Sequence, residues 1–209
     1  MVQISDTLVF YCGGASAGWG TRGERVDWTA AAFTLDIETG LQTRLTNMTE
    51  ATGGHALVYV NEKVYKIGGW LRGNKTKICE VYPIVEASIY SNWRVIDPLP
   101  ITPGHTTAAL YKNEIWVTGG NTNKISAYDL TTEKHRVVDV ELPSDKCYKF
   151  ILSRGPDLYV ITGKHENIKF HRGVKQDTTL TGDLDTHSWP CGTLGYDGRA
   201  TFYFADSKG

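Results

Sequence analysis

VNEKVYKIGGW, at residues 60–70, is the stretch that decides the fold, because the same pattern recurs elsewhere in the chain. KNEIWVTGGN occupies residues 112–121, and SDTLVFYCGGA occupies residues 5–15. Each copy has a polar turn, a short segment rich in β-branched and aromatic residues that favours a strand, and then a Gly-Gly pair. The first glycines of successive pairs are 55 and 51 residues apart. A nearly constant spacing of this length indicates a repeat architecture.

The pattern continues in a weaker form toward the C-terminus. RGPDLYVITGK at residues 154–164 has Thr162-Gly163 where the pair belongs, and residues 196–208 have Ala205-Asp206 there. Upstream of each later turn lies another apolar run, at residues 57–60, 108–111, 150–153 and 193–196. Two short strands around a polar turn form a β-hairpin, so each unit is predicted to hold a central hairpin.

Two further strand candidates follow the glycine pair in each of the first three units. They span residues 31–36 and about 42–45, then 79–90 and 93–99, then 125–130 and 136–142. Four strands per unit are typical of a propeller blade, because a twisted four-stranded sheet buries both faces only against neighbouring blades. No long segment has helical periodicity. We therefore expect an all-β propeller of about four units, at roughly residues 1–50, 51–101, 102–145 and 146–190, with a partial unit at 191–209.

The units resemble the kelch repeat. The resemblance rests on the Gly-Gly pairs, on the Tyr128-Asp129-x-Thr131 turn, on Trp93 followed by Pro98-Leu99-Pro100, and on Gly104-His105 before the next strand. It is strong in the second and third units and weak in the last two. The position of Trp93 is matched by His135 in the third unit and by about Gln42 in the first, so an aromatic residue of this kind is not kept at that position. The resemblance implies a kelch-type β-propeller.

The glycine pairs are predicted to be structural. A residue without a side chain permits a positive φ and a close approach of backbones where an inner strand ends. A phosphate-binding loop would need a helix after the glycines, and none is predicted. This interpretation covers Gly13, Gly14, Gly68, Gly69, Gly119, Gly120 and Gly163.

The phase of the repeat predicts an incomplete or edge-open propeller. The first unit is expected to begin at its second strand, and the last unit ends just after its second strand. The chain is then part of a larger propeller or needs another chain over its open edges, since edge strands are templates for association. A homo-oligomer is one such arrangement. A compact four-bladed ring closed by strand displacement is the alternative.

Composition narrows the classes of partner and cofactor. The net charge of −1 gives no long-range field for nucleic acid or an anionic membrane, and no apolar run reaches 18 residues. The four cysteines form no CxxC pair, which argues against a metal clip or redox dithiol and favours reduced thiols in the cytoplasm. The family resemblance suggests the cytoskeleton as one setting. We expect no metal and no cofactor.

The histidines and the tyrosine–cysteine pairs do not predict a reaction centre. His55 and His105 precede their hairpins at similar points, so the repeat explains them, while His165 and His171 have no cysteine or carboxylate arranged around them. Propellers that resemble this one include copper radical oxidases and a sialic acid epimerase. Tyr11-Cys12 and Cys147-Tyr148 are adjacent residues whose side chains point to opposite faces of a strand, which does not make a copper site.

The loops that follow the glycine pairs are the predicted binding surface. They follow equivalent strands and should lie on one face, and function in such folds resides in loops. Arg and Trp are enriched at binding hot spots, and arginine suits a carboxylate ligand. The candidates are Trp19, Arg22, Arg25, Trp70, Arg72, Lys75, Asn121, Lys124 and His165.

The sequence therefore predicts a non-catalytic scaffold that binds a protein partner through this loop face or its open edges, within a larger assembly. In the kelch family the corresponding face commonly docks proteins, which is what the resemblance implies. The alternative is a small propeller enzyme or a lectin-like module that acts on an anionic sugar or a carboxylate ligand. Arg22, Arg25 and Arg72 are the residues that favour this alternative.

Overall fold

The computed structural model describes residues 1–14, 27–84, 91–120, 122–142, 149–162 and 168–176, together with two short strands at 195–196 and 202–203. The prediction of an all-β chain is confirmed: these residues form strands, turns and bends, without a helix among them. No helix that could span a membrane occurs in this part of the chain.

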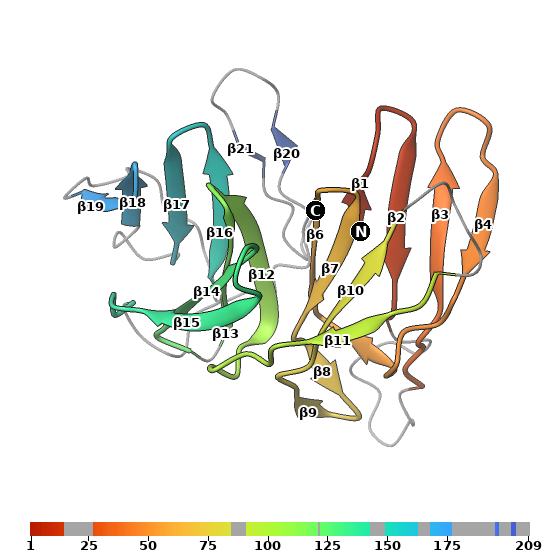
Figure 1. The fold of residues 1–209 in the computed structure, drawn as a ribbon, viewed down its shortest axis with the longest axis horizontal. Coiled ribbons are helices and arrows are strands. Elements are labelled where there is room, and N and C mark those ends of the chain that lie inside the picture. Colours follow the sequence, from red (N-terminus) through yellow and green to blue (C-terminus); the bar gives the residue numbers. More distant parts are fainter. Residues whose placement is uncertain are drawn as a thin grey trace.

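Four antiparallel sheets of four strands each make up most of the molecule (Figure 1). In each sheet the strands lie in chain order from the inner to the outer edge. The first sheet holds β1 (Val2–Gln3), β2 (Leu8–Cys12), β3 (Ala32–Asp36) and β4 (Gln42–Leu45). The second holds β6 (Ala56–Val60), β7 (Lys63–Ile67), β10 (Cys79–Pro83) and β11 (Arg94–Ile96). The third holds β12 (Gly104–Tyr111), β13 (Glu114–Gly120), β14 (Ile125–Asp129) and β15 (Lys134–Val138), and the fourth holds β16 (Phe150–Arg154), β17 (Asp157–Ile161), β18 (Ile168–His171) and β19 (Val174–Gln176).

Two smaller sheets complete the described structure. A three-stranded sheet joins β5 (Thr52–Gly53), β8 (Trp70–Leu71) and β9 (Asn74–Lys75). β8 and β9 form a hairpin inserted between the second and third strands of the second sheet, and the sequence did not predict it. A separate pair joins β20 (Gly195–Tyr196) and β21 (Phe202–Tyr203).

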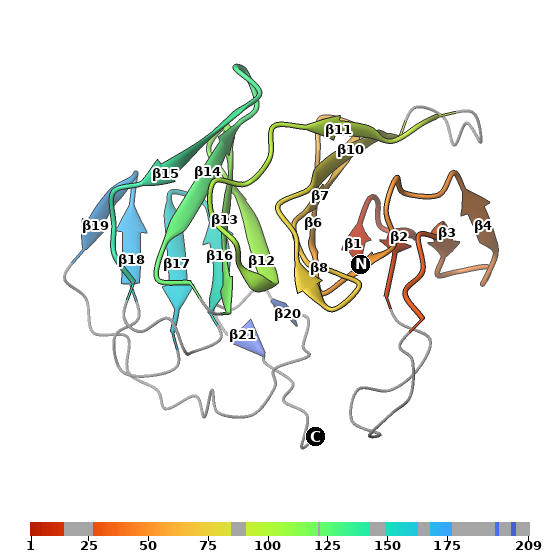
Figure 2. The same ribbon diagram turned by 90° about the horizontal axis from the view of Figure 1, so that it is seen from below.

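The four sheets pack side by side. Contacts join β1 to β6, β6 to β12, and β12 to β16. Figures 1 and 2 show the first and fourth sheets at opposite sides of the molecule, with the second and third between them. Each pair of neighbours encloses its own apolar core, in which aromatic side chains from the middle strands face those of the next sheet. These cores contain Phe10, Val64 and Tyr82, then Tyr65, Val117 and Tyr128, then Trp116, Leu158 and Phe170.

The first sheet corrects the expected phase of the repeat. It was predicted to lack an inner strand, but β1 pairs with β2 through Val2–Phe10 and Gln3–Val9. Two residues are too short to give an alternating pattern, so pairing rather than local preference defines this strand.

Two predicted turns lie one residue earlier than expected. The turn placed at Asn113-Glu114 is Lys112-Asn113, and that placed at Pro156-Asp157 is Gly155-Pro156, because Glu114 and Asp157 already pair across their hairpins. The turn at Asn61-Glu62 is where it was predicted. Its two residues have φ of 51° and 55°, as a tight hairpin turn requires.

Candidate functional site

The ends of the second strands lie beside the starts of the neighbouring inner strands across the first three sheets. We use the term loop face for Cys12–Gly14, Thr52–His55, Gly68–Lys75 and Gly104–Thr106, where second strands end and inner strands begin. Hydrogen bonds join these segments from one sheet to the next: the Gly14 N–H donates to the Thr52 carbonyl at 2.9 Å, and the Thr106 N–H donates to the Gly54 carbonyl at 2.8 Å. The face is therefore a continuous, backbone-bonded surface across the first three sheets.

The glycine pairs allow these segments to approach closely. Gly69 has a φ of +102°, and a Cβ on it would lie 2.7 Å from the Gly53 carbonyl oxygen and 2.9 Å from the His55 backbone nitrogen. Gly13 has a φ of +67°, and a Cβ on it would collide with the Thr52 carbonyl oxygen. Such distances leave no space for a side chain. Gly163 lies outside the described residues.

Trp70 and Lys75 form the most prominent feature of the loop face. They are directly opposite each other in the β8–β9 hairpin, so their side chains lie on the same side of it. A Cβ on Gly104 would meet the Trp70 ring at 2.9 Å and the Lys75 side chain at 3.4 Å. The His105 ring lies 5.8 Å from the Trp70 ring. Figure 1 shows the hairpin projecting below the second sheet.

Arg72 stands at the tip of this hairpin. It is exposed and has a φ of +50° in the turn between β8 and β9. Lys124 is also exposed and lies in the equivalent loop of the third sheet, between β13 and β14, where its carbonyl accepts a hydrogen bond from the Thr118 hydroxyl at 3.1 Å. The structure thus brings Trp70, Arg72 and Lys75 together on one hairpin. The other candidates, Trp19, Arg22, Arg25, Asn121 and His165, lie outside the described residues.

Within the loop face, the half-buried His55 and the buried Cys12 form an uncharged pair. The Cys12 Sγ is 3.5 Å from the His55 Nε2, and the Thr52 Oγ1 is 3.3 Å from the His55 Nδ1. Burial and the nearby Lys66 ammonium lower the pKa of His55 to about 3. Burial raises the pKa of the Cys12 thiol to about 12. Both groups are neutral near pH 7, and their contacts are structural.

The strand register separates the two histidines that the repeat placed at similar points. Val60 and Tyr111 are equivalent, because each is the last residue of its inner strand before the hairpin turn. Counting back from them, His105 is equivalent to Gly54, and His55 is equivalent to Thr106. The Thr106 Oγ1 accepts a hydrogen bond from the Gly69 N–H at 3.1 Å. His55 likewise lies against the glycine pair of the preceding sheet, beside Gly13. The position is therefore one that ties neighbouring sheets together.

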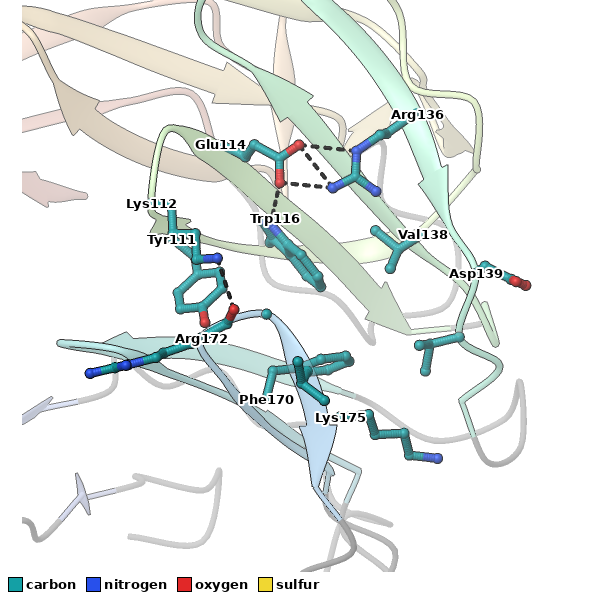
Figure 3. Close-up of a pocket in the computed structure, with 13 residues that line it drawn as sticks. Tyr111, Lys112, Glu114, Trp116, Arg136, Val138, Asp139, Phe170, Arg172 and Lys175 are labelled. Atoms are coloured by element: carbon teal, nitrogen blue, oxygen red, sulfur yellow. Dashed lines mark hydrogen bonds and ion pairs between the residues drawn. The ribbon is translucent and has the colours of Figure 1, made fainter.

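A groove between the third and fourth sheets is a second candidate site, which the sequence did not predict (Figure 3). Its volume is about 450 Å³. The floor is aromatic, with the Trp116 ring 5.3 Å from the Phe170 ring. Arg136, Arg172 and Lys175 line its walls and are exposed.

One carboxylate in the groove is already neutralised. The Glu114 oxygens accept hydrogen bonds from the Arg136 guanidinium at 2.8 Å and from the Trp116 Nε1 at 3.0 Å. The Arg136 guanidinium also lies 5.9 Å from the centre of the Trp116 ring. These contacts hold Arg136 in place, and Figure 3 shows it between Glu114 and Val138. No short motif marks this site because its residues come from β13, β15, β18 and β19.

Within the described residues, no three His, Cys, Asp or Glu side chains lie close enough together to hold a metal ion.

No family model matches the chain, and no curated protein matches it. A solved structure described as "Structure of YjhT" is similar, with a TM-score of 0.60 and 13% sequence identity. The match covers 74% of this chain and 56% of that chain. At this identity the similarity shows the fold alone. The described sheets and this similarity are consistent with a β-propeller-like fold.

Proposed function

We propose that the chain is a kelch-type propeller unit that acts as a non-catalytic scaffold and binds an acidic protein partner on its loop face. The β8–β9 hairpin carries this proposal, because it presents Trp70, Arg72 and Lys75 together at the edge of a backbone-bonded surface. A half-buried tryptophan beside an exposed arginine and a half-buried lysine has the residue composition of a binding hot spot.

The anchoring of the hairpin supports a role in binding. β8 pairs with β5 through Thr52–Leu71 and Gly53–Trp70, and the Trp70 ring lies against Gly104 of the third sheet. A hairpin held on two sides loses little conformational freedom when a partner docks, which favours affinity. The nearby thiol does not favour nucleophilic catalysis by Cys12, since a nucleophilic cysteine needs a lowered pKa and that of Cys12 is raised to about 12.

Affinity capture followed by binding measurements with the purified partner tests this proposal. We expect a stoichiometric partner to bind the unmodified chain and the Arg72→Glu/Lys75→Glu variant to bind it at least about tenfold more weakly, or ~1.4 kcal/mol. Lys63→Glu is the matched control, because Lys63 is an exposed lysine of the same sheet at the opposite end of β7. Equal affinity of the double variant and the control would contradict the assignment of the face. Absence of a stoichiometric partner, with a thermal shift induced by acidic sugars, would favour the anionic-ligand alternative.

A further inference from the structure

The third strands of the second, third and fourth sheets carry equivalent aromatic residues. Tyr82 pairs with Val64, Tyr128 with Ile115, and Phe170 with Leu158. All six residues are buried, and each pair belongs to the core that its sheet forms with the preceding sheet. The three aromatic residues therefore mark one position in the repeated architecture, and the residues next to them on the outer strands can be compared directly.

A ring fills the outer position in two of the three interfaces. Trp93, directly before β11, lies 5.2 Å from Tyr82 and donates its Nε1 hydrogen to the Thr46 carbonyl, after β4 of the first sheet, at 3.0 Å. His135 on β15 pairs with Tyr128, its ring 4.9 Å away. His135 also reaches the second sheet, where its Nε2 is 3.7 Å from the Cys79 Sγ. Each ring closes the outer gap between two sheets.

Lys175 occupies this position in the fourth sheet. It pairs with Phe170 across β18 and β19, but its side chain is exposed and lines the groove. Whereas Trp93 is only 7% exposed against the first sheet, the gap between the third and fourth sheets is not closed by a ring of its own chain among the described residues. The groove lies where a ring at position 175 would lie. Its floor of Trp116 and Phe170 resembles the surroundings of Trp93, whose ring is 6.0 Å from that of Phe10 and 5.2 Å from that of Tyr82.

We propose that this groove binds a segment of a partner protein that has an aromatic residue flanked by acidic residues. The aromatic ring would occupy the position that Trp93 occupies between the first and second sheets, edge-on to the aromatic floor, where ring pairs are favourable. The acidic neighbours would pair with Lys175 and Arg172 at the rim, where charge-assisted hydrogen bonds form. The site is separate from the loop face.

The charges of the groove favour a carboxylate-bearing peptide. Four cationic side chains, of Lys112, Arg136, Arg172 and Lys175, lie around it against the carboxylates of Glu114 and Asp139. Glu114 is bound by Arg136 and Trp116, so the free charge at the rim is positive. An aromatic floor of this kind suits an aromatic side chain of a peptide.

Fluorescence anisotropy with labelled synthetic heptapeptides tests this proposal. The probe is fluorescein-labelled Gly-Glu-Glu-Trp-Glu-Glu-Gly, compared with versions that have Ala for Trp or Gln for every Glu. We expect saturable binding of the probe and at least about tenfold weaker binding of both altered peptides. Equal binding of the Ala peptide would overturn the role of the ring, and equal binding of the Gln peptide would overturn the role of charge.

Two variants of Lys175 locate the binding. Lys175→Glu is expected to weaken binding of the probe at least about tenfold. Lys175→Trp supplies the missing ring from the chain itself, so it should raise the urea midpoint of unfolding and abolish binding. Arg44→Glu is the matched control, an exposed cation on the outer strand of the first sheet. If Lys175→Trp bound the probe as tightly as Arg44→Glu does, the binding site would not be this groove. Arg72→Glu on the loop face is expected to leave binding of the probe unchanged.

Discussion

At the scale of single residues, the glycines with a positive φ do two different things. Some supply only the backbone conformation, as Gly40 does with a φ of +71° and no atom within 4 Å of the place that a Cβ would take. Others also allow backbone contact between sheets, as Gly69 does beside Gly53 and His55. The second role is more costly to lose, because a methyl group there must displace backbone atoms.

Gly69→Ala is therefore expected to lower the free energy of unfolding by about 2–4 kcal/mol, from strain at positive φ together with overpacking. Gly40→Ala separates the two causes, since it adds strain without a clash, and we expect a loss of only ~1 kcal/mol. Urea denaturation monitored by circular dichroism measures both. Equal losses in the two variants would show that φ alone, and not the approach of His55, requires glycine at position 69.

The residue scale also shows what the sequence could and could not predict. The Gly-Gly pairs and the Asn61-Glu62 turn carry local signals, since φ preference depends on the residue itself. The partners of those glycines carry none. Neither the contact of Gly69 with Gly53 nor the equivalence of His55 and Thr106 follows from the sequence spacing. Both depend on a shift of one residue between the strands of neighbouring sheets.

At the scale of elements, the second sheet contains a buried ion pair between adjacent strands. Lys66 on β7 pairs with Glu80 on β10, and their side chains, with no exposed surface, lie 3.1 Å apart. Glu80 also accepts hydrogen bonds from the Thr49 N–H at 2.9 Å and the Thr49 hydroxyl at 2.5 Å. It thereby joins the second sheet to the segment that follows the first.

Glu80→Gln is expected to lower the free energy of unfolding by about 3–5 kcal/mol, because it leaves the Lys66 ammonium buried without a counterion. Lys66→Met/Glu80→Leu removes both charges and should recover much of that loss. Glu133→Gln is the surface control: it breaks the Arg94–Glu133 pair, whose side chains are 54% and 45% exposed, and should cost less than ~1 kcal/mol. Urea midpoints of the three variants give the comparison. A double variant no more stable than Glu80→Gln would contradict the buried-charge explanation.

Longer strands with an alternating pattern were predicted from the sequence, and very short strands were not. β6, β14 and β4 lie within or next to the runs predicted for them, since alternation over four or more residues is a local signal. β1 and the β8–β9 hairpin were missed because two-residue strands depend on their partners. The groove was missed for a related reason: Glu114, Arg136 and Lys175 are on separate strands, and only the packing of two sheets brings them together.

At the scale of the whole molecule, half-buried histidines lie in two of the three interfaces between the four described sheets. His55 joins the first and second sheets through Cys12, and His135 joins the second and third through Cys79. Burial lowers the pKa of His55 to about 3 and that of His135 to about 4. The core between the third and fourth sheets is built instead from apolar residues such as Trp116, Leu158 and Phe170.

These shifts predict a stability that falls as the pH falls below about 6.5. In the unfolded chain both imidazoles bind protons near pH 6.5, whereas in the folded chain they stay neutral down to about pH 4 or below. Between these values the unfolded state binds more protons, so each histidine contributes a loss of up to about 1.4 kcal/mol per pH unit. The stabilisation is complete above pH 6.5 and is lost toward about pH 4 for His135 and about pH 3 for His55.

The position of the histidines predicts which interfaces open first. At pH 5, hydrogen exchange corrected for intrinsic rates should show β2, β6 and β10 losing protection before β16, β17 and β18, relative to pH 7. A His55→Gln/His135→Gln variant should be less stable at pH 7 but have a shallower dependence on pH. Asp157 does not act in this window, because hydrogen bonds from Lys169 and His171 lower its pKa to about 2, so its stabilisation is lost only below about pH 4. Uniform loss of protection across all four sheets would show instead that the molecule unfolds as one cooperative unit, with no interface weaker than the others.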